Sequence, residues 1–138
     1  MPDQYVNERY PLSRLTSRII AAAQEVHHQL GPGFREIIYQ RALEVELPQH
    51  RVEYEREVWI SIHYKGAKIG RHRVDFVAGD EEGGVLIELK AKSALDDVDP
   101  VQTLSYLKSS GYEVALLINF GKKKLEVRRL VNSQARRD

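Results

Sequence analysis

The sequence has no cysteine, which excludes disulfide bonds, cysteine nucleophiles and zinc sites built on thiolates. Any metal ion must therefore be held by oxygen or imidazole ligands. No apolar run approaches the roughly 18 residues that a membrane-spanning helix needs, and residues 1–14 lack the apolar core of a signal peptide. Neither the nucleophile motif G-x-S-x-G nor the phosphate-binding motif G-x-x-x-x-G-K-[ST] occurs. We therefore expect a cytoplasmic protein without membrane contacts, and neither a serine hydrolase with that motif nor a P-loop nucleotide-binding protein.

An overall excess of one charge is also missing, because 21 Lys and Arg face 20 Asp and Glu, for a net charge of +1. The balance hides an asymmetry, since residues 1–120 carry 14 basic and 18 acidic side chains, whereas residues 121–138 carry 7 basic and 2 acidic ones. We expect an anionic partner to meet the C-terminal end first. The length of 138 residues and the 42% hydrophobic content predict a single domain over residues 1–138, with flexible tails at 1–11 and 132–138.

The hydrophobic pattern changes its period along the chain and predicts helices first, then strands. Apolar residues recur at steps of three or four over 12–30 and 34–45, on either side of a Gly31-Pro32-Gly33 turn, as in amphipathic helices. A third helix is expected to start at Asp99, an N-cap followed by proline, and to end at Gly111. Strands are expected over residues 52–64, 68–78, 85–91, 114–120 and 125–131. The resulting α-α-β-β-β-α-β-β order predicts one α/β domain with a mixed sheet.

Charged residues interrupt two of the apolar strands. Glu88 and Lys90 stand two residues apart and project from the same face of their strand, while Asp75 lies on the preceding strand, which can pair with it. Asp75 and Glu88 can then converge, and two close carboxylates favour a shared Mg²⁺ or Mn²⁺ ion. Lys90 can orient water or offset developing charge, so the pattern indicates phosphodiester hydrolysis. A solvated strand face or a simple ion pair is the alternative interpretation.

These residues resemble the signature of the PD-(D/E)XK nuclease superfamily, in which an acid is followed on the next strand by acid-x-Lys. The segment Gly33-Phe34-Arg35-Glu36-Ile37-Ile38-Tyr39 also resembles the motif of the GxxExxY protein family, a branch of that superfamily. One departure is Val74, where the superfamily has proline before the first acid. Similar blocks run in the family's order through nearly the whole chain, namely VHHQLGPGFREIIYQRALEVEL, YKGAKIG, IELKA, QTLSYL and LLINFG.

The resemblance implies a single-domain α/β fold with a restriction-endonuclease-like core, α-β-β-β-α-β, and a mixed central sheet flanked by helices. It also implies metal-dependent cleavage of nucleic acid, with DNA as the expected substrate, RNA as the alternative, and Mg²⁺ or Mn²⁺ as the cofactor. Asp75, Glu88 and Lys90 would be catalytic, with both acids as metal ligands. A homodimer is one way for a small nuclease to cut two strands. The competing hypothesis is a catalytically inactive nuclease-fold module for nucleic-acid binding or protein interaction.

Two helices supply further candidates. The resemblance implies that Glu36 adds a catalytic carboxylate to the metal site, although a residue that caps the Gly33 N–H is an equally good explanation. Gln102 and Tyr106 resemble the QxxxY element of RecB-like nucleases, in which these residues organise the catalytic lysine and the nucleic acid. We expect them on the helix face opposite an apolar face formed by residues 101, 104 and 107.

His27 is a candidate for the metal site, because the resemblance extends to RecB-like enzymes that bring an upstream histidine to a metal. It also falls on the apolar face of its helix, so a hydrogen-bonded core position is the alternative. His28, His63 and His72 are expected at the surface.

Basic residues in two places are candidates for nucleic-acid binding. Lys122, Lys123 and Lys124, followed by Arg128 and Arg129, could follow a phosphate backbone. Arg71 and Arg73 lie on the strand that leads to the first acid. A solvated turn is the alternative for the lysines. No aromatic residue is interleaved with these basic residues in the sequence, so we expect recognition of backbone and shape without base stacking.

Overall fold

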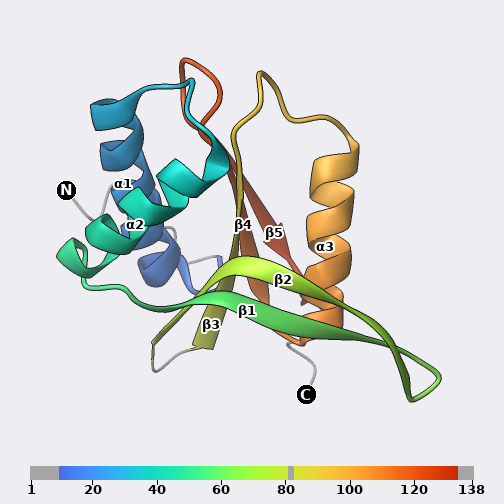
Figure 1. Ribbon diagram of the computed structural model, residues 1–138. Coiled ribbons are helices and arrows are strands. Elements are labelled where there is room, and N and C mark those ends of the chain that lie inside the picture. Colours follow the sequence, from blue (N-terminus) through green and yellow to red (C-terminus); the bar gives the residue numbers. More distant parts are fainter. Residues whose placement is uncertain (1–9, 81–82, 134–138) are drawn as a thin grey trace.

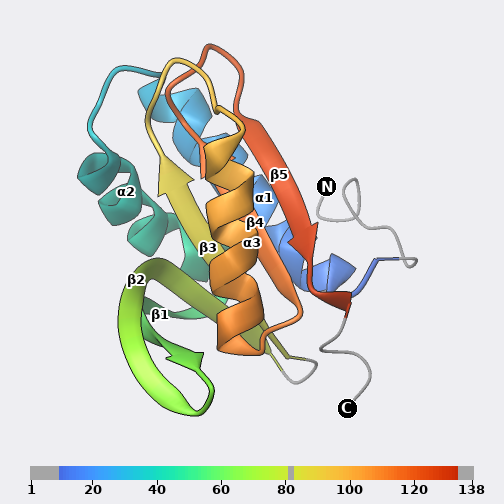
Figure 2. The ribbon, with the colours of Figure 1, turned by 90° about the vertical axis from the view of Figure 1, so that its right-hand side faces the viewer.

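The computed structural model describes residues 10–80 and 83–133. Its helices are α1 (Ser13–Leu30), α2 (Glu36–Gln49) and α3 (Val98–Ser110), and its strands are β1 (Glu53–Tyr64), β2 (Ala67–Asp80), β3 (Gly83–Lys90), β4 (Val114–Asn119) and β5 (Glu126–Val131). The strands form one five-stranded sheet in the order β1-β2-β3-β4-β5. Helices α1 and α2 cover one face of this sheet and α3 covers the other (Figure 1, Figure 2). The predicted order of elements and the mixed sheet are confirmed.

The centre of the sheet sets the side on which the predicted site residues lie. Strands β3 and β4 are parallel and are joined through α3, whereas the other neighbouring strands are antiparallel. Ile87 and Leu89 pack with α1 and α2, and Leu86 packs with α3. Because side chains alternate along a strand, Glu88 and Lys90 point to the α3 side of the sheet.

The β1–β2 hairpin turns over partway along its length. Phe76 packs with α1 and α2, whereas Val74, two residues away on β2, packs in the cluster under α3. Side chains two residues apart normally share a face, so β2 rotates between these positions. On β1, Glu57 has a left-handed φ of 56°, and the β2–β3 ladder ends at the Phe76–Ile87 pair. The outer half of the hairpin therefore leaves β3, packs against α3 and projects beyond the sheet (Figure 1).

Helix α3 differs from the sequence prediction in its start and in its buried face. It begins at Val98, so Asp99, the predicted N-cap, lies inside the first turn and is buried. Val101, predicted on the buried face, is 65% exposed, whereas Leu107 is buried as expected. Asp99 turns inward to accept a hydrogen bond from Lys92 Nζ at 2.9 Å, and the Asp99 and Leu107 side of the helix consequently faces the sheet.

The expectation of flexible tails at 1–11 and 132–138 falls largely outside the described part of the chain. Where they are described, the ends are anchored. Arg129 donates a hydrogen bond to the Pro11 carbonyl, and Asn132 is buried with its N–H hydrogen-bonded. Arg129 also donates to the Thr16 hydroxyl, so its guanidinium group joins β5 to the start of α1. No described helix is long and apolar enough to cross a membrane.

Candidate active site

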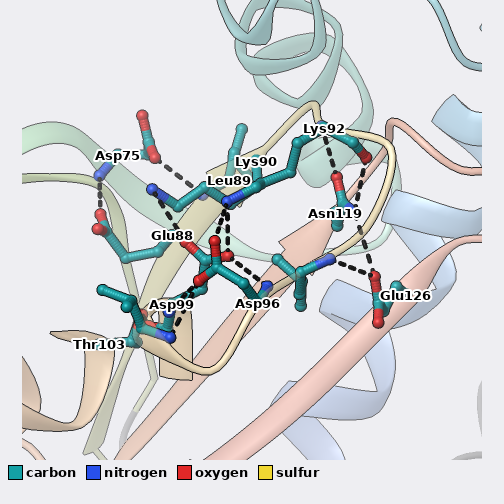
Figure 3. Close-up of polar contacts among 12 residues, drawn as sticks. Asp75, Glu88, Leu89, Lys90, Lys92, Asp96, Asp99, Thr103, Asn119 and Glu126 are labelled. Atoms are coloured by element: carbon teal, nitrogen blue, oxygen red, sulfur yellow. Dashed lines mark hydrogen bonds and ion pairs between the residues drawn. The ribbon is translucent and has the colours of Figure 1, made fainter. Parts of the chain in front are cut away.

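The two acids that the sequence predicts to converge do meet, at the point where β2 and β3 separate. Directly beyond the last ladder pair, the Asp75 N–H donates to Glu88 Oε1 at 3.2 Å, and the Leu89 N–H donates to Asp75 Oδ2 at 2.9 Å (Figure 3). Each carboxylate thus binds a backbone N–H of the neighbouring strand, where a regular ladder would present a carbonyl oxygen. The fork in the sheet therefore holds both acids in place.

Burial raises the pKa of both carboxyl groups, and the charge of Asp75 raises the pKa of Glu88 further. Burial is the largest cause for Glu88, the charge of Asp75 adds to it, and together they raise the pKa of Glu88 to about 8. Burial also raises the pKa of Asp75, and the hydrogen bond from Leu89 offsets part of that rise. The charge of Glu36 raises the pKa of both acids, and the charge of Lys90 lowers it. Near neutral pH, Glu88 consequently keeps a proton in the metal-free protein.

The donor set suits a hard divalent cation. Asp75 and Glu88 lie on neighbouring strands, close enough for the charge of Asp75 to raise the pKa of Glu88, and a cation between them would relieve that repulsion. Among residues 10–80 and 83–133, no three His, Asp or Glu side chains are grouped so that they could hold a metal ion. Glu36 is exposed and does not complete such a group. The two carboxylates still fit Mg²⁺ or Mn²⁺, since Mg²⁺ commonly binds through one or two carboxylates with waters and phosphate oxygens.

The segment from Gly33 to Tyr39 builds the turn between α1 and α2. Gly33 has a φ of 116°, which a residue with a side chain rarely adopts. The hydroxyl of the buried Tyr39 donates to the Gly31 carbonyl at 2.6 Å and accepts from the Phe34 N–H at 3.2 Å. Glu36 opens α2, and the expected capping bond to Gly33 is not formed. The glycine and the tyrosine of the motif are thus structural, and the glutamate remains free to face the acids.

We expect Tyr39→Phe to destabilise the protein by about 1–2 kcal/mol, because two hydrogen bonds to the turn are lost in a buried place. Urea unfolding would measure the change in the free energy of unfolding. Tyr112→Phe is the matched control, since Tyr112 is half-buried and its hydroxyl has no hydrogen-bond partner among the described residues. Equal stability of Tyr39→Phe and wild type would mean that the hydroxyl does not hold the turn.

Gln40, which follows the motif, was not identified from the sequence. It is buried, and its Nε2 donates to Asp75 Oδ1 at 3.3 Å. Helix α2 therefore reaches the acid pair through Gln40. The only signal in the sequence was its place next to Tyr39, on a helix whose inner face was predicted from apolar residues alone.

His72 was wrongly predicted to be a surface residue. It is half-buried, its Nε2 lies 3.0 Å from Glu88 Oε2, and its ring stacks on Tyr106 with centroids 3.6 Å apart and planes 4° apart. Burial lowers the pKa of His72, with opposing contributions from the charges of Asp75 and Lys90. A neutral imidazole beside a protonated Glu88 forms a hydrogen bond without a buried ion pair. His28 and His63 are exposed, as expected.

Lys90 ends β3 at the edge of the acid pair (Figure 3). Its Nζ lies 3.9 Å from Asp99 Oδ1, and the other oxygen of Asp99 accepts from Lys92 Nζ. The amine lowers the pKa of both Asp75 and Glu88, so it acts on them electrostatically. The buried Asp99 thus fixes the start of α3 and provides a counter-charge for Lys90, a partner that the sequence did not predict.

A polar clamp fixes the loop that follows Lys90. Asn119 Oδ1 accepts from the N–H groups of Lys92 at 3.0 Å and Gly121 at 3.1 Å, and its Nδ2 donates to the Lys92 carbonyl at 2.9 Å. A Cβ on Gly121 would lie 2.3 Å from the Lys92 carbonyl oxygen, so only glycine fits there. The ends of β3 and β4 are therefore joined beside the site.

The remaining candidates on the helices differ in whether they contact the acid pair. Tyr106 reaches the acids through its stack on His72, whereas Gln102 is exposed and makes no side-chain hydrogen bond to the described residues. His27 is buried, and its Nε2 lies 2.8 Å from the Lys122 carbonyl oxygen. That contact favours the hydrogen-bonded core position for His27.

The basic candidates lie in two separate places. Lys123 and Lys124 are exposed in the turn after β4, and Lys122 Nζ lies 4.0 Å from Glu126 Oε2. Arg71 and Arg73 lie on the exposed outer half of β2. A hollow of about 1140 Å³ is lined by residues at the base of the hairpin and by Tyr112, and it does not include the acids.

A model of a protein family matches most of the chain. The model of the PD-(D/E)XK nuclease superfamily matches residues 13–130. A solved structure described as "Crystal structure of SSO0001" is similar to the chain at 14% sequence identity, with a TM-score of 0.47, over 88% of this chain and 82% of that chain. No curated protein matches the sequence. Because the family match spans the helices, the acid strands and β4, the chain belongs to the PD-(D/E)XK nuclease superfamily.

Proposed function

We propose that the protein hydrolyses phosphodiester bonds in nucleic acid with the help of Mg²⁺ or Mn²⁺. The observation that carries this proposal is the pair of carboxylates, Asp75 and Glu88, held together at the sheet fork at a cost that raises both pKa values. A purely structural polar pair gains nothing from this arrangement, whereas a bound cation would relieve the repulsion that raises the pKa of Glu88.

Each side chain has a role in this proposal. Asp75 and Glu88 hold the cation, which would supply Lewis-acid activation of water and of the phosphate. Lys90 orients the attacking water or offsets the charge that develops on the phosphate. Glu36 would bind the cation through water, and its charge raises the pKa of both acids. Gln102 contacts Lys90 or the nucleic acid only once substrate is bound.

Finer aspects belong to the same proposal. We assign the chain to the GxxExxY branch, on the support of Gly33 and Tyr39, whose roles in the turn need these residue types. DNA is the proposed substrate, a homodimer is the proposed form for cutting two strands, and the cytoplasm is the proposed location, in line with the absence of cysteine.

A cleavage assay tests the proposal. Purified protein is incubated with labelled linear, flapped and four-way DNA and with RNA, in Mg²⁺, in Mn²⁺ and in EDTA. We expect at least one substrate to be cut in metal and none in EDTA. If no substrate is cut although the protein binds nucleic acid, the inactive binding module is the correct interpretation.

The lysine turn after β4 predicts a salt effect. We expect the Lys122, Lys123 and Lys124 triple alanine variant to bind DNA more weakly in EDTA and to lower the slope of log K against log salt by about two. The expected loss is about two phosphate contacts and not three, because Lys122 already faces Glu126. Fluorescence anisotropy of labelled DNA measures this slope, with Lys108→Ala as the control. An unchanged slope would place the binding surface elsewhere.

A further inference from the structure

The outer half of the β1–β2 hairpin carries an aromatic residue between two arginines. Trp59 is 50% exposed and is the only tryptophan of the chain. The guanidinium carbon of Arg71 lies 3.9 Å from the centroid of the Trp59 ring, and that of Arg73 lies 5.6 Å from it. We call these three residues the Trp59 platform.

The register of the hairpin creates the Trp59 platform. Trp59 pairs with Arg73, and Ser61 pairs with Arg71, so these side chains lie on one face. The intervening residues Ile60 and His72 point the other way, to the cluster under α3 and to Tyr106. The platform face is thus forced outward. Aromatic interleaving, which we did not find along the sequence, exists across the strands.

The charge of this half of the hairpin suits an anionic polymer. Residues 58–74 contain four Lys or Arg and no Asp or Glu. Arg73 lies 3.7 Å from Glu57 at the base of this segment, and Arg71 has no carboxylate partner among the described residues. Arg71 therefore offers a guanidinium group to a phosphate without breaking an ion pair.

The Trp59 platform lies a short distance from Asp75 along the chain. Arg71, Arg73 and Asp75 occupy alternate positions of β2, and at about 3.3 Å per residue they span about 13 Å. That length corresponds to roughly four nucleotides at the 3.4 Å spacing of stacked bases. A nucleic-acid strand whose phosphate lies at Asp75 can therefore reach the Trp59 platform within a few nucleotides.

We propose that the Trp59 platform binds an unpaired segment of the substrate, with a base stacked on Trp59 and the adjoining phosphates on Arg71 and Arg73. This inference rests on the proposed function and names its substrate class, which is single-stranded, flapped or frayed nucleic acid. Inside a continuous duplex both faces of every base are covered by neighbouring pairs, so only an unpaired base can stack on the ring.

Intrinsic fluorescence tests the platform directly, because Trp59 is the only tryptophan. The full-length protein is titrated in EDTA with an oligothymidylate of about 15 nucleotides and with a blunt duplex of equal length. We expect the single strand to quench the emission and the duplex to leave it nearly unchanged. No quenching at saturation with the single strand would overturn the proposal.

Variants give an independent measurement. By anisotropy of labelled oligonucleotides, Trp59→Ala should weaken single-strand binding on the order of tenfold, Trp59→Phe should weaken it less, and both should leave duplex binding nearly unchanged. Arg71→Ala should weaken binding and lower the salt slope, and the exposed Arg41 on α2 supplies the control Arg41→Ala. Circular dichroism checks that each variant is folded. If Trp59→Ala does not fold, the proposal is tested by the affinity of Trp59→Phe and by the quenching of the wild-type protein.

The remaining outcomes are distinct from those of the cleavage assay. Quenching by single strands without cleavage in any metal supports the Trp59 platform and contradicts the nuclease proposal. Cleavage with equal single-strand binding by wild type, Trp59→Ala and Trp59→Phe supports the nuclease and overturns the platform. If Trp59→Ala instead dissociates an oligomer in sedimentation, this face is an interface between copies of the chain and the proposal is wrong.

Discussion

Lys90→Ala, Asp75→Ala and Glu88→Ala should each lower the rate of metal-dependent cleavage by roughly a hundredfold or more. Each of the two acid variants removes a cation ligand. Lys90→Ala removes the amine that stabilises the negative charge developing on the phosphate. Losses of this size are typical when such groups are removed. The assay is single-turnover cleavage of the best substrate in Mg²⁺ and Mn²⁺. Lys90 is also expected to be the most informative of the three positions. Its only ionic partner in the described chain is Asp99, which also pairs with Lys92, so Lys90→Ala leaves no buried carboxylate without a partner.

The matched control for this experiment is Lys108→Ala, which removes an exposed amine from α3. It should cleave at the wild-type rate. If Lys90→Ala cleaves as fast as wild type, either the activity belongs to a contaminant or Lys90 has no role in the reaction. Asp75→Asn is a less useful variant than Asp75→Ala, because both oxygens of Asp75 accept hydrogen bonds, from Gln40 and from Leu89. An amide group would point N–H at one of these donors.

In the absence of metal, the melting temperature should fall as the pH rises from about 6.5 to 8. The pKa of Glu88 is raised to about 8 in the folded protein, so in this range the unfolded state has lost a proton that the folded state keeps. Stability then decreases with pH, by at most about 1.4 kcal/mol per pH unit. The lowered pKa of His72 acts in the opposite direction, but only below about pH 6.5, where the unfolded imidazole gains a proton. Thermal unfolding in EDTA at several pH values measures this slope.

Glu88→Gln tests the effect of the carboxylate charge while the size of the side chain is kept. The amide keeps an oxygen for the Asp75 N–H but carries no charge. We expect this variant to flatten the pH dependence and to melt several degrees above wild type at pH 8 without metal. Millimolar Mn²⁺ should raise the melting temperature of wild type, because the ion binds the folded state, and should not raise that of Glu88→Gln.

The opposite result would change the assignment of the site. If wild type does not respond to Mn²⁺ and Glu88→Gln is less stable than wild type at pH 8, the acids form a structural hydrogen-bonded network with His72 and Gln40. The chain would then be better described as an inactive nuclease fold that binds nucleic acid.

The sequence predicts the parts of this protein that depend on period and spacing. Asp75 and Glu88 converge as predicted, because two antiparallel strands joined by a short turn bring these positions together. His72 was misplaced because β2 rotates between Val74 and Phe76, and no local pattern shows where a strand turns over. Beyond the residue where a strand rotates, the alternation of the sequence no longer predicts which side chains are buried.

Two other errors have a similar physical cause. Val101 was placed on the buried face of α3 because it is apolar, but the ion pair of Asp99 with Lys92, seven residues apart in the chain, sets the rotation of the helix. Trp59 and Arg71 are far apart in sequence and come together only through the register of the hairpin. Contacts that depend on register or on long-range ion pairs cannot be obtained from periodicity alone.

The position of β1 at the edge of the sheet has a consequence for solubility. A long edge strand offers a row of free N–H and C=O groups to which a second molecule can add a strand, which is the usual start of aggregation. Here the strand is interrupted by the left-handed Glu57 and by a register shift between Ile62 and His63, and charged side chains stand at positions 53, 55 and 56. The rotation that carries the hairpin away from β3 thus also prevents β1 from presenting a straight template for fibre growth.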